Sequence, residues 1–384
     1  MQIPAYIENW LEVDLDAVRA NAAEIRRHLP AETRLCAVVK ADAYGLGAVE
    51  VARALYGHVD LLAVTSLAEA IELRRAEVKG DILVFTPLRE GQAELFRRYR
   101  LTATVDAMAP LTELAEAGPI PTPCQIKVNT GMNRFGCDEE TALELARYAS
   151  RHAALHLTGI YTHLANAAEK SDYNKQMKSF RSVLDKLKKE GIDYGAAHAA
   201  NSPATLLYAD ACLDMVRCGT LLYGQKSVEQ PKDKDWQLAD PCRFRARVLE
   251  VRTMSKGAPV GYGGDESAKK GAKLAICAMG YADGLAVETA ARFMSSEIYF
   301  KKAAKAASGK NRPYARHNGQ ALPLIGRIAM QTCCVDISGT DIKVGDVLDM
   351  PLRRVTASSR LPRYYKLDGE LTASRDYRLG GEEL

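Results

Sequence analysis

LCAVVKADAYGLG (35–47) is the stretch that decides the fold: five apolar residues end on a lysine, and a turn containing glycine follows. A short apolar run bounded by turn residues is typical of a strand that is buried on both faces. Residues 15–29, which precede it, place apolar side chains at the spacing of an amphipathic helix. A helix followed by such a strand predicts an α/β fold.

The same alternation continues through the first 225 residues. Further strand-like runs occupy 60–65, 81–86, 101–105, 125–129, 157–163, 194–199 and 214–217, with helical patterns between them. Eight strands that alternate with helices predict a (β/α)8 TIM-type barrel. A doubly wound open sheet is the alternative, but eight units exceed its usual count.

The pattern changes after QPKDKDW (230–236), a polar stretch that we interpret as a linker. Short runs typical of strands follow at 244–254, 273–279, 295–300, 335–338 and 346–350. Because 384 residues exceed one ordinary core, we expect two domains. They are a barrel over 11–232 and a mainly β domain over 233–384 that includes residues 1–10. The basic stretch 301–320 is expected to form an exposed loop, and we assign it no function.

The composition is that of a soluble globular protein, with 47% hydrophobic and 26% charged residues. A net charge of +4 argues against a nucleic-acid or membrane partner. No apolar run is long enough to span a bilayer, and the acidic start is not typical of a signal peptide. The nine cysteines lack metal-ligand spacing, so we expect core thiols, no metal site and a cytoplasmic protein.

Residues of unusual chemistry stand where barrel strands end, which is where barrel enzymes carry their active sites. Lys40 ends the first run, and partial burial there should lower its pKa and free its amine for a Schiff base. The alternative is a lysine that only extends to the barrel rim. His163 ends the sixth run.

The loops after the last two barrel strands commonly bind phosphate. HAANS (198–202) and RCGTLLYG (217–224) occupy these places and offer Ser202, Gly219 and Thr220. Ordinary turn chemistry is the alternative for each of the three residues taken alone. Together with a lysine on the first strand, they favour pyridoxal phosphate bound across the barrel mouth.

VVKADAYGLG (38–47) resembles the cofactor-lysine motif of the alanine racemase family, whose members are fold-type III pyridoxal-phosphate enzymes. Eight further matches follow in the family's order: KVNTGMNRFG (127–136), GIYTHLA (159–165), HAANSPA (198–204), VRCGTLLYG (216–224), GYGGD (261–265), GYADG (280–284), GRIAM (326–330) and RLPRYY (360–365). The resemblance therefore covers almost the whole chain.

The resemblance implies a homodimer whose active site is shared between subunits, and it implies roles for individual residues. Lys40 would hold the cofactor and act as the base on the D face, and Tyr262 of the other subunit would act on the L face. Arg217 would face the pyridine nitrogen, and His163 would hydrogen-bond Arg217 and help to tune Tyr262. The cofactor-binding set would be Lys40, Tyr44, His163, Asn201, Ser202, Arg217, Gly219 and Thr220.

The substrate site is implied in the same way. Arg134 would orient the substrate carboxylate with help from the backbone amide of Met330, and Tyr281 would line the entrance. Lys127 matches a lysine that is carbamylated in many members of the family and that buttresses this arginine.

These roles make physical sense for racemisation. Removing the α-proton from one face and returning one to the other needs two bases on opposite sides of a planar intermediate. A free tyrosine titrates near pH ~10, so a tyrosine base needs cationic neighbours. A guanidinium keeps its protons, so a pyridine nitrogen facing Arg217 stays largely unprotonated. The weaker electron sink should suppress transamination.

Several positions depart from the family's usual pattern. Asn129 stands where an aspartate is usual, and Gln331 and Thr332 replace an aspartate and a glutamine. Fewer anions near the expected substrate carboxylate would favour a substrate with a second polar or anionic group. The stretch 350–359 also lacks the usual second gate tyrosine, and Arg353 and Arg354 lie there instead. The sequence thus leaves alanine or a larger, polar amino acid open as the substrate.

Two other functions remain as alternatives. Related decarboxylases share this kind of fold, but they place an acidic residue at the pyridine nitrogen, where this chain has Arg217. A non-catalytic cofactor carrier would not need the second domain or Tyr262.

Overall fold

The computed structural model describes residues 1–118, 120–231, 235–287 and 312–376. The chain divides into two compact units, one of Leu15–Pro241 and one of Met1–Asp14 with Cys242–Leu384. Each unit is described by itself below.

The first unit contains a parallel sheet of eight strands in the order β8-β7-β6-β5-β4-β3-β2-β9. The strands are β2 (Arg34–Val38), β3 (Leu61–Val64), β4 (Ile82–Val84), β5 (Thr102–Val105), β6 (Thr122–Lys127), β7 (Leu155–Tyr161), β8 (Ala196–His198) and β9 (Met215–Cys218). The sheet closes between β8 and β9, because the amide of Asp214 donates to Ala197 O at 3.1 Å and that of Arg217 donates to Ala200 O at 2.9 Å. The predicted (β/α)8 barrel is confirmed, with strands at all eight predicted places.

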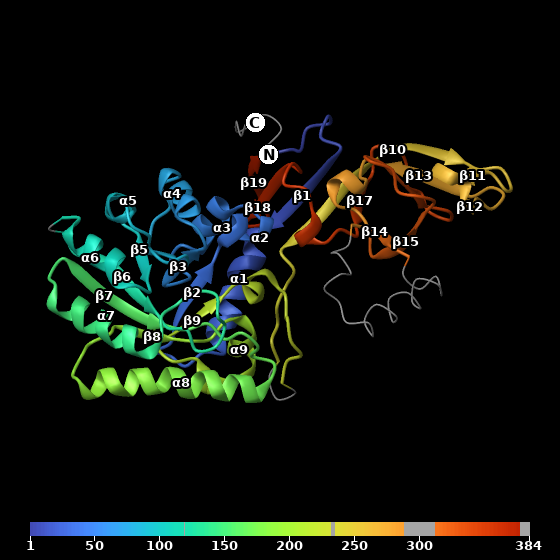
Figure 1. Ribbon diagram of the computed structural model, residues 1–384. Helices are drawn as coiled ribbons and strands as arrows, with labels where there is room; N and C mark the ends of the chain where they lie inside the picture. The colour runs from blue at the N-terminus through green and yellow to red at the C-terminus, as the bar shows by residue number, and fades with distance from the viewer. Residues whose placement is uncertain (119, 232–234, 288–311, 377–384) are drawn as a thin grey trace. The chain divides into compact units, whose positions relative to one another are not determined.

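Helices connect these strands and lie around the sheet (Figure 1). They are α1 (Leu15–Arg27), α2 (Lys40–Gly45), α3 (Ala48–Leu55), α4 (Leu67–Arg75), α5 (Ala93–Arg98), α6 (Met108–Glu116), α7 (Glu139–Arg151), α8 (Lys170–Lys189) and α9 (Ser202–Leu207). Helix α7 shows why they form here: Asp138 caps its first turn by accepting the Thr141 amide at 2.9 Å. Its buried side chains recur at helical spacing and so make one continuous apolar face: Ala142, Leu143, Leu145, Ala146 and Ala149.

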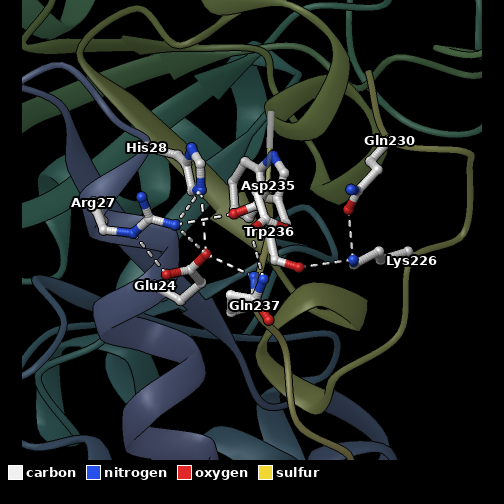
Figure 2. A network of polar contacts seen from close by, with 8 residues as sticks. All are labelled: Glu24, Arg27, His28, Lys226, Gln230, Asp235, Trp236 and Gln237. Carbon is white, nitrogen blue, oxygen red and sulfur yellow. Dashed lines mark hydrogen bonds and ion pairs between the residues drawn. The ribbon is translucent and has the colours of Figure 1, made fainter. Parts of the chain in front are cut away.

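Asp235 and Trp236 end the stretch 230–236, which we interpreted as a linker, and they pack against the end of α1 (Figure 2). The Trp236 ring is buried and stacks on His28, with ring centroids 4.0 Å apart. Glu24 accepts hydrogen bonds from Arg27 and from the Gln237 amide. The linker prediction is therefore wrong for this end of the stretch, because one aromatic side chain outweighs its polar neighbours in deciding burial.

The second unit is mainly β, as predicted. Its sheet runs in the order β13-β16-β15-β14-β17-β10-β1-β18-β19, and β11 and β12 form a separate hairpin. The strands are β1 (Asn9–Asp14), β10 (Cys242–Thr253), β11 (Pro259–Val260), β12 (Glu266–Ser267), β13 (Lys273–Cys277), β14 (Tyr314–His317), β15 (Gln320–Ile325), β16 (Cys333–Asp336), β17 (Val347–Met350), β18 (Arg363–Leu367) and β19 (Glu370–Arg375). Strand β1 lies between β10 and β18.

Part of the predicted loop 301–320 is also regular structure, since β14 pairs with β15 from Tyr314 to His317. Residues 301–311 and the predicted strand 295–300 lie outside the described residues. All nine cysteines are free, and seven of them are buried. In the described ranges no helix is long and apolar enough to cross a bilayer, and no three metal-ligating side chains gather.

Candidate active site

A cavity of about 440 Å³ opens among residues at the carboxyl ends of the barrel strands. All ten of the predicted site residues that belong to the first unit line it: Lys40, Tyr44, Lys127, Arg134, His163, Asn201, Ser202, Arg217, Gly219 and Thr220. No aspartate or glutamate is among its lining residues in the described part of the chain. The cavity is therefore suited to an anionic ligand.

Lys40 stands at the start of a left-handed helical turn. The four residues that follow, from Ala41 to Tyr44, have φ between 50° and 57°. Left-handed backbone costs roughly 1–2 kcal/mol per residue that is not glycine, so surrounding contacts must hold this turn. It brings the Tyr44 ring back beside Lys40, with Nζ 5.9 Å from the ring centroid. Burial and the nearby Arg134 lower the pKa of Lys40, which keeps a larger share of the amine neutral.

The ends of the last two barrel strands form a cradle for an anion. Ser202 Oγ accepts hydrogen bonds from the amides of Gly219 at 3.0 Å and Leu221 at 3.4 Å. Thr220 Oγ1 is buried without a partner among the described residues. A Cβ on Gly219 would lie 2.2 Å from Tyr44 Oη, so only glycine lets the tyrosine approach. The cradle thus holds one unused buried hydroxyl beside a tyrosine hydroxyl.

Arg217 is almost completely buried, and its donors can be counted. Nη1 bonds His198 Nδ1 at 2.7 Å and His198 O at 3.2 Å. Nη2 bonds Thr162 O at 2.7 Å and Ala199 O at 3.0 Å. A guanidinium has five N–H groups, and the remaining one, on Nε, is buried without a partner in the described part of the chain. Because Arg217 lines the cavity, this is the donor it has left for a ligand.

The predicted hydrogen bond between His163 and Arg217 is wrong in this structure, because Arg217 bonds His198 instead. His163 still lines the cavity, and burial together with Arg217 lowers its pKa to about 3. His198, the first residue of HAANS (198–202), is a site residue that we did not predict from the sequence. Its place at the end of β8, one strand from Arg217, is the signal that marks it.

Lys127 and Arg134 add two further cations to the cavity. Lys127 is buried, and burial with nearby Arg217 and Arg134 lowers its pKa to about 8. Its Nζ lies 5.3 Å from the centroid of the Phe135 ring and 5.5 Å from that of Tyr161.

The Asn129 side chain serves the loop in front of Arg134. Its oxygen accepts the amides of Gly131 at 3.1 Å and Asn133 at 3.0 Å, and its nitrogen donates to Asn133. It is not among the residues that line the 440 Å³ cavity. The amide thus orders a turn, so Asn129 gives no support for a second polar group on the substrate.

The other predicted residues lie in the second unit and are exposed there. Tyr262 is 72% exposed, Tyr281 48% and Met330 57%. The backbone amide of Tyr281 donates to Ala329 O at 3.0 Å, which holds the two segments together. The structure of one chain leaves these side chains free for contact with another molecule.

Comparisons with known proteins agree with this architecture. Family models of the alanine racemase N-terminal and C-terminal domains match residues 13–227 and 242–357. The alanine racemase of Desulforamulus reducens is 34% identical, with 93% of this chain and 98% of that protein covered. Alanine racemase 2 of Bacillus subtilis is 33% identical, with 95% and 96% covered.

Solved structures are similar over nearly the whole chain. The alanine racemase of Clostridium difficile 630 matches with a TM-score of 0.82 at 27% identity and covers 97% of this chain and 99% of its own. That of Bacillus anthracis, with bound L-Ala-P, has a TM-score of 0.78 at 26% identity, covering 98% and 100%. The fold and these matches define an amino-acid racemase, which is an isomerase. The chain belongs to the alanine racemase family.

Proposed function

We propose that this protein interconverts the L- and D-enantiomers of alanine with pyridoxal phosphate as its cofactor and works as a homodimer. The observation that carries the proposal is the cavity itself: Lys40 lies there with Thr220 Oγ1 and Arg217 Nε, two buried polar atoms that lack partners among the described residues. Alanine is the substrate named for the relatives of this chain.

The residues present fit this cofactor at its three polar positions. The hydroxyls of Tyr44, Ser202 and Thr220 would hold the phosphate, with the backbone around Gly219 and Asn201. Arg217 Nε–H would donate to the pyridine nitrogen, since the other guanidinium N–H groups are already used. Lys40 would carry the covalent link. When bound, pyridoxal phosphate withdraws electrons from the α-carbon of the attached amino acid and makes its proton acidic.

Two side chains would move the proton. Lys40 Nζ would take or return it on one face, and burial, which lowers its pKa, prepares it for this role. Tyr262 Oη of a second copy of the chain would serve the other face, which is why the proposal requires a homodimer. A group exposed to 72% is available for such a contact.

Arg217 would set the reaction outcome by holding the pyridine nitrogen unprotonated. Guanidinium gives up its proton far less readily than a pyridinium does, so Arg217 donates a hydrogen bond and transfers no proton. A weaker electron sink favours prompt return of the proton to the α-carbon over transamination.

Arg134 would bind the substrate carboxylate, aided by the Met330 amide, and Tyr281 would line the entrance. Lys127 would be carbamylated, because only a neutral amine reacts with carbon dioxide and a pKa of about 8 supplies one near neutral pH. The resulting anion would buttress Arg134 and offset the surrounding positive charge. We place the protein in the cytoplasm as part of the same proposal.

A panel of enantiopure amino acids tests the function, with loss of optical rotation and incorporation of solvent deuterium as readouts. We expect alanine to turn over fastest, with larger polar amino acids included because of Gln331 and the region around Arg353 and Arg354. Faster turnover of a polar amino acid than of alanine would overturn the assignment of alanine as the substrate. No racemisation of any amino acid by the loaded protein would overturn the function.

Two measurements test the residues. Borohydride reduction should fix the cofactor on Lys40, which mass spectrometry of the Lys40 peptide detects. Tyr262→Phe should keep the absorbance of the bound cofactor and lose racemisation in both directions. Full activity of this variant would remove Tyr262 from the mechanism.

A further inference from the structure

Three buried side chains form a hydrogen-bonded chain that runs inward from the candidate site. Oε1 of Gln125, a residue of β6, lies 3.0 Å from Nε2 of His198. Nδ1 of the same histidine lies 2.7 Å from Nη1 of Arg217. The exposed fractions are 3% for Gln125, 0% for His198 and 2% for Arg217. Gln125 and His198 are not among the residues that line the cavity. They can therefore affect a ligand in the cavity only through their effect on Arg217.

The protons of this chain are determined by its chemistry. Arginine has no acceptor, so His198 Nδ1 must accept the hydrogen bond from Arg217. A neutral imidazole has one N–H group, which must then be on Nε2 and point at Gln125. Only the carbonyl oxygen of Gln125 accepts it. Both contacts of His198 thus require the same neutral tautomer.

The surroundings of His198 also favour the neutral ring. Tyr161 of β7 stacks on it, with ring centroids 4.9 Å apart and an angle of 12° between the planes. Arg217 of β9 and Arg34 of β2 are the charged groups that act on it. Burial together with these two cations lowers the pKa of His198 well below its ordinary value.

Gln125 is held in one place by the strand beside it. Its register partner is Gly159 of β7. A Cβ on Gly159 would lie 3.1 Å from Gln125 Cδ and 2.8 Å from Ala196 O. Glycine at 159 therefore makes the room that the Gln125 amide fills.

From this geometry we infer that Gln125 is a positioning residue for Arg217. By accepting the Nε2–H of His198, Gln125 keeps the Nδ1 lone pair aimed at Arg217, so that the guanidinium leaves only its Nε–H for a ligand. The cofactor part of this inference rests on the proposed function, but the hydrogen-bonded chain exists without any ligand. The two are therefore separable by experiment.

The decisive variant is Gln125→Glu, which puts an anion where the amide accepts. A carboxylate beside Nε2–H should stabilise a doubly protonated His198, which then has no lone pair left for Arg217. The first readout is ¹⁵N NMR of the cofactor-free protein labelled at its seven histidines, in which His198 is identified by the loss of its signal in His198→Gln. We expect wild-type His198 to be neutral with the proton on Nε2 from pH 6 to pH 8, and Gln125→Glu to hold it doubly protonated at pH 6.

A second variant keeps the test decisive if the buried carboxylate prevents folding. Gln125→Met has a similar size but no acceptor, so His198 should stay neutral while its Nε2-bound proton exchanges with water faster. Gln176→Glu is the matched control, because Gln176 is also a buried glutamine of the barrel unit but bonds Thr130 and the His163 backbone. It should leave the His198 signals unchanged.

The loaded protein supplies the second readout. Gln125→Glu should raise transamination per racemisation event by about tenfold, a change that a purely structural defect would not produce because both reactions would fall together. The inference is overturned by a wild-type His198 that is protonated or carries its proton on Nδ1, or by Gln125 variants that leave His198 unchanged. If the NMR results hold and no amino acid is racemised, the proposed function fails and the positioning chain stands.

Discussion

The carboxylate of Glu69 accepts a 2.6 Å hydrogen bond from the backbone amide of Ala41, the residue that follows Lys40. The same carboxylate accepts the amides of Thr65 at 2.9 Å and Ser66 at 2.8 Å and completes the capping box of α4. One side chain therefore joins the first turn of a helix to the left-handed turn that carries Lys40. This contact helps to offset the backbone strain beside the reactive lysine.

Glu69→Ala should loosen this turn. The three amides would lose their acceptor, so we expect the free energy of unfolding to fall by about 1–3 kcal/mol. The pKa of Lys40 should fall further, because Glu69 is the group that raises it against burial and Arg134. Denaturant unfolding and the pH dependence of cofactor binding measure the two effects. Glu72→Ala, an exposed glutamate on the same helix, is the control, and equal behaviour of both variants would contradict the prediction.

Thr220→Val separates ligand binding from folding. Because Thr220 Oγ1 is buried without a partner among the described residues, its removal should leave the stability of the cofactor-free protein unchanged or slightly higher. Its loss should weaken pyridoxal phosphate binding by about tenfold, which is worth ~1.4 kcal/mol. Thr205→Val is the contrast, since its hydroxyl donates to Asn201 O at 2.9 Å and its loss should lower stability. A Thr220→Val protein with wild-type affinity would exclude this hydroxyl from the cradle.

Lys127→Met should raise the thermal unfolding midpoint of the cofactor-free protein at pH 7 in buffer without carbon dioxide. The pKa of Lys127 is lowered to about 8 in the folded protein, chiefly by burial and by Arg217 and Arg134. Between pH 8 and about 10.5 the folded protein binds fewer protons than the unfolded chain, so wild-type stability rises with pH there. The advantage of the methionine should be full below pH 8 and fade towards pH 10.5.

Bicarbonate should reverse this ranking if Lys127 is carbamylated. The carbamate would replace a buried cation by an anion among cations, so the wild type should gain stability and Lys127→Met should not. An added signal from ¹³C-labelled carbon dioxide in the wild type alone would identify the carbamate. Equal responses of the two proteins to bicarbonate would show that Lys127 stays an amine.

Glu24→Gln tests the contact between α1 and the segment that ends at Trp236 (Figure 2). Hydrogen bonds from Arg27 and from the Gln237 amide lower the pKa of Glu24 to about 2. This depressed pKa stabilises the fold above the ordinary carboxyl range near 4.5, and the stabilisation is lost as the pH falls towards 2. We expect Glu24→Gln to be less stable by about 1–2 kcal/mol at pH 7 and to approach the wild type in stability as the pH falls towards 2. A difference that does not change with pH would mean that the charge of Glu24 contributes nothing.

The periodicity of apolar residues was sufficient to predict the barrel. The runs 35–39 and 61–64 are apolar throughout because each strand is buried on both sides, so the sequence pattern directly reflects the burial of the strand. Prediction failed where one contact outweighed composition. Trp236 is buried within a polar stretch, and Tyr314–His317 forms a strand within a basic stretch that has no apolar alternation.

The candidate site also has a part that the sequence predicts and a part that it does not. That Lys40, Ser202, Gly219 and Thr220 lie at one end of the barrel follows from their places after apolar runs, because parallel strands all end at the same edge. Which histidine bonds Arg217 did not follow. His163 and His198 both lie at strand ends, and their distances to the guanidinium depend on side-chain directions within a closed barrel.

By itself the sequence determined which apolar runs form the barrel strands, in what order these strands occur and which chemical groups stand at their ends, because local patterns of polarity carry this information. Only the tertiary structure decided how those groups are aimed. It placed His198 in hydrogen-bond contact with Arg217, Gln125 with His198, and Glu69 with the turn after Lys40. Each of these choices depends on hydrogen-bond geometry between residues far apart in the chain, which exists only once the barrel has closed.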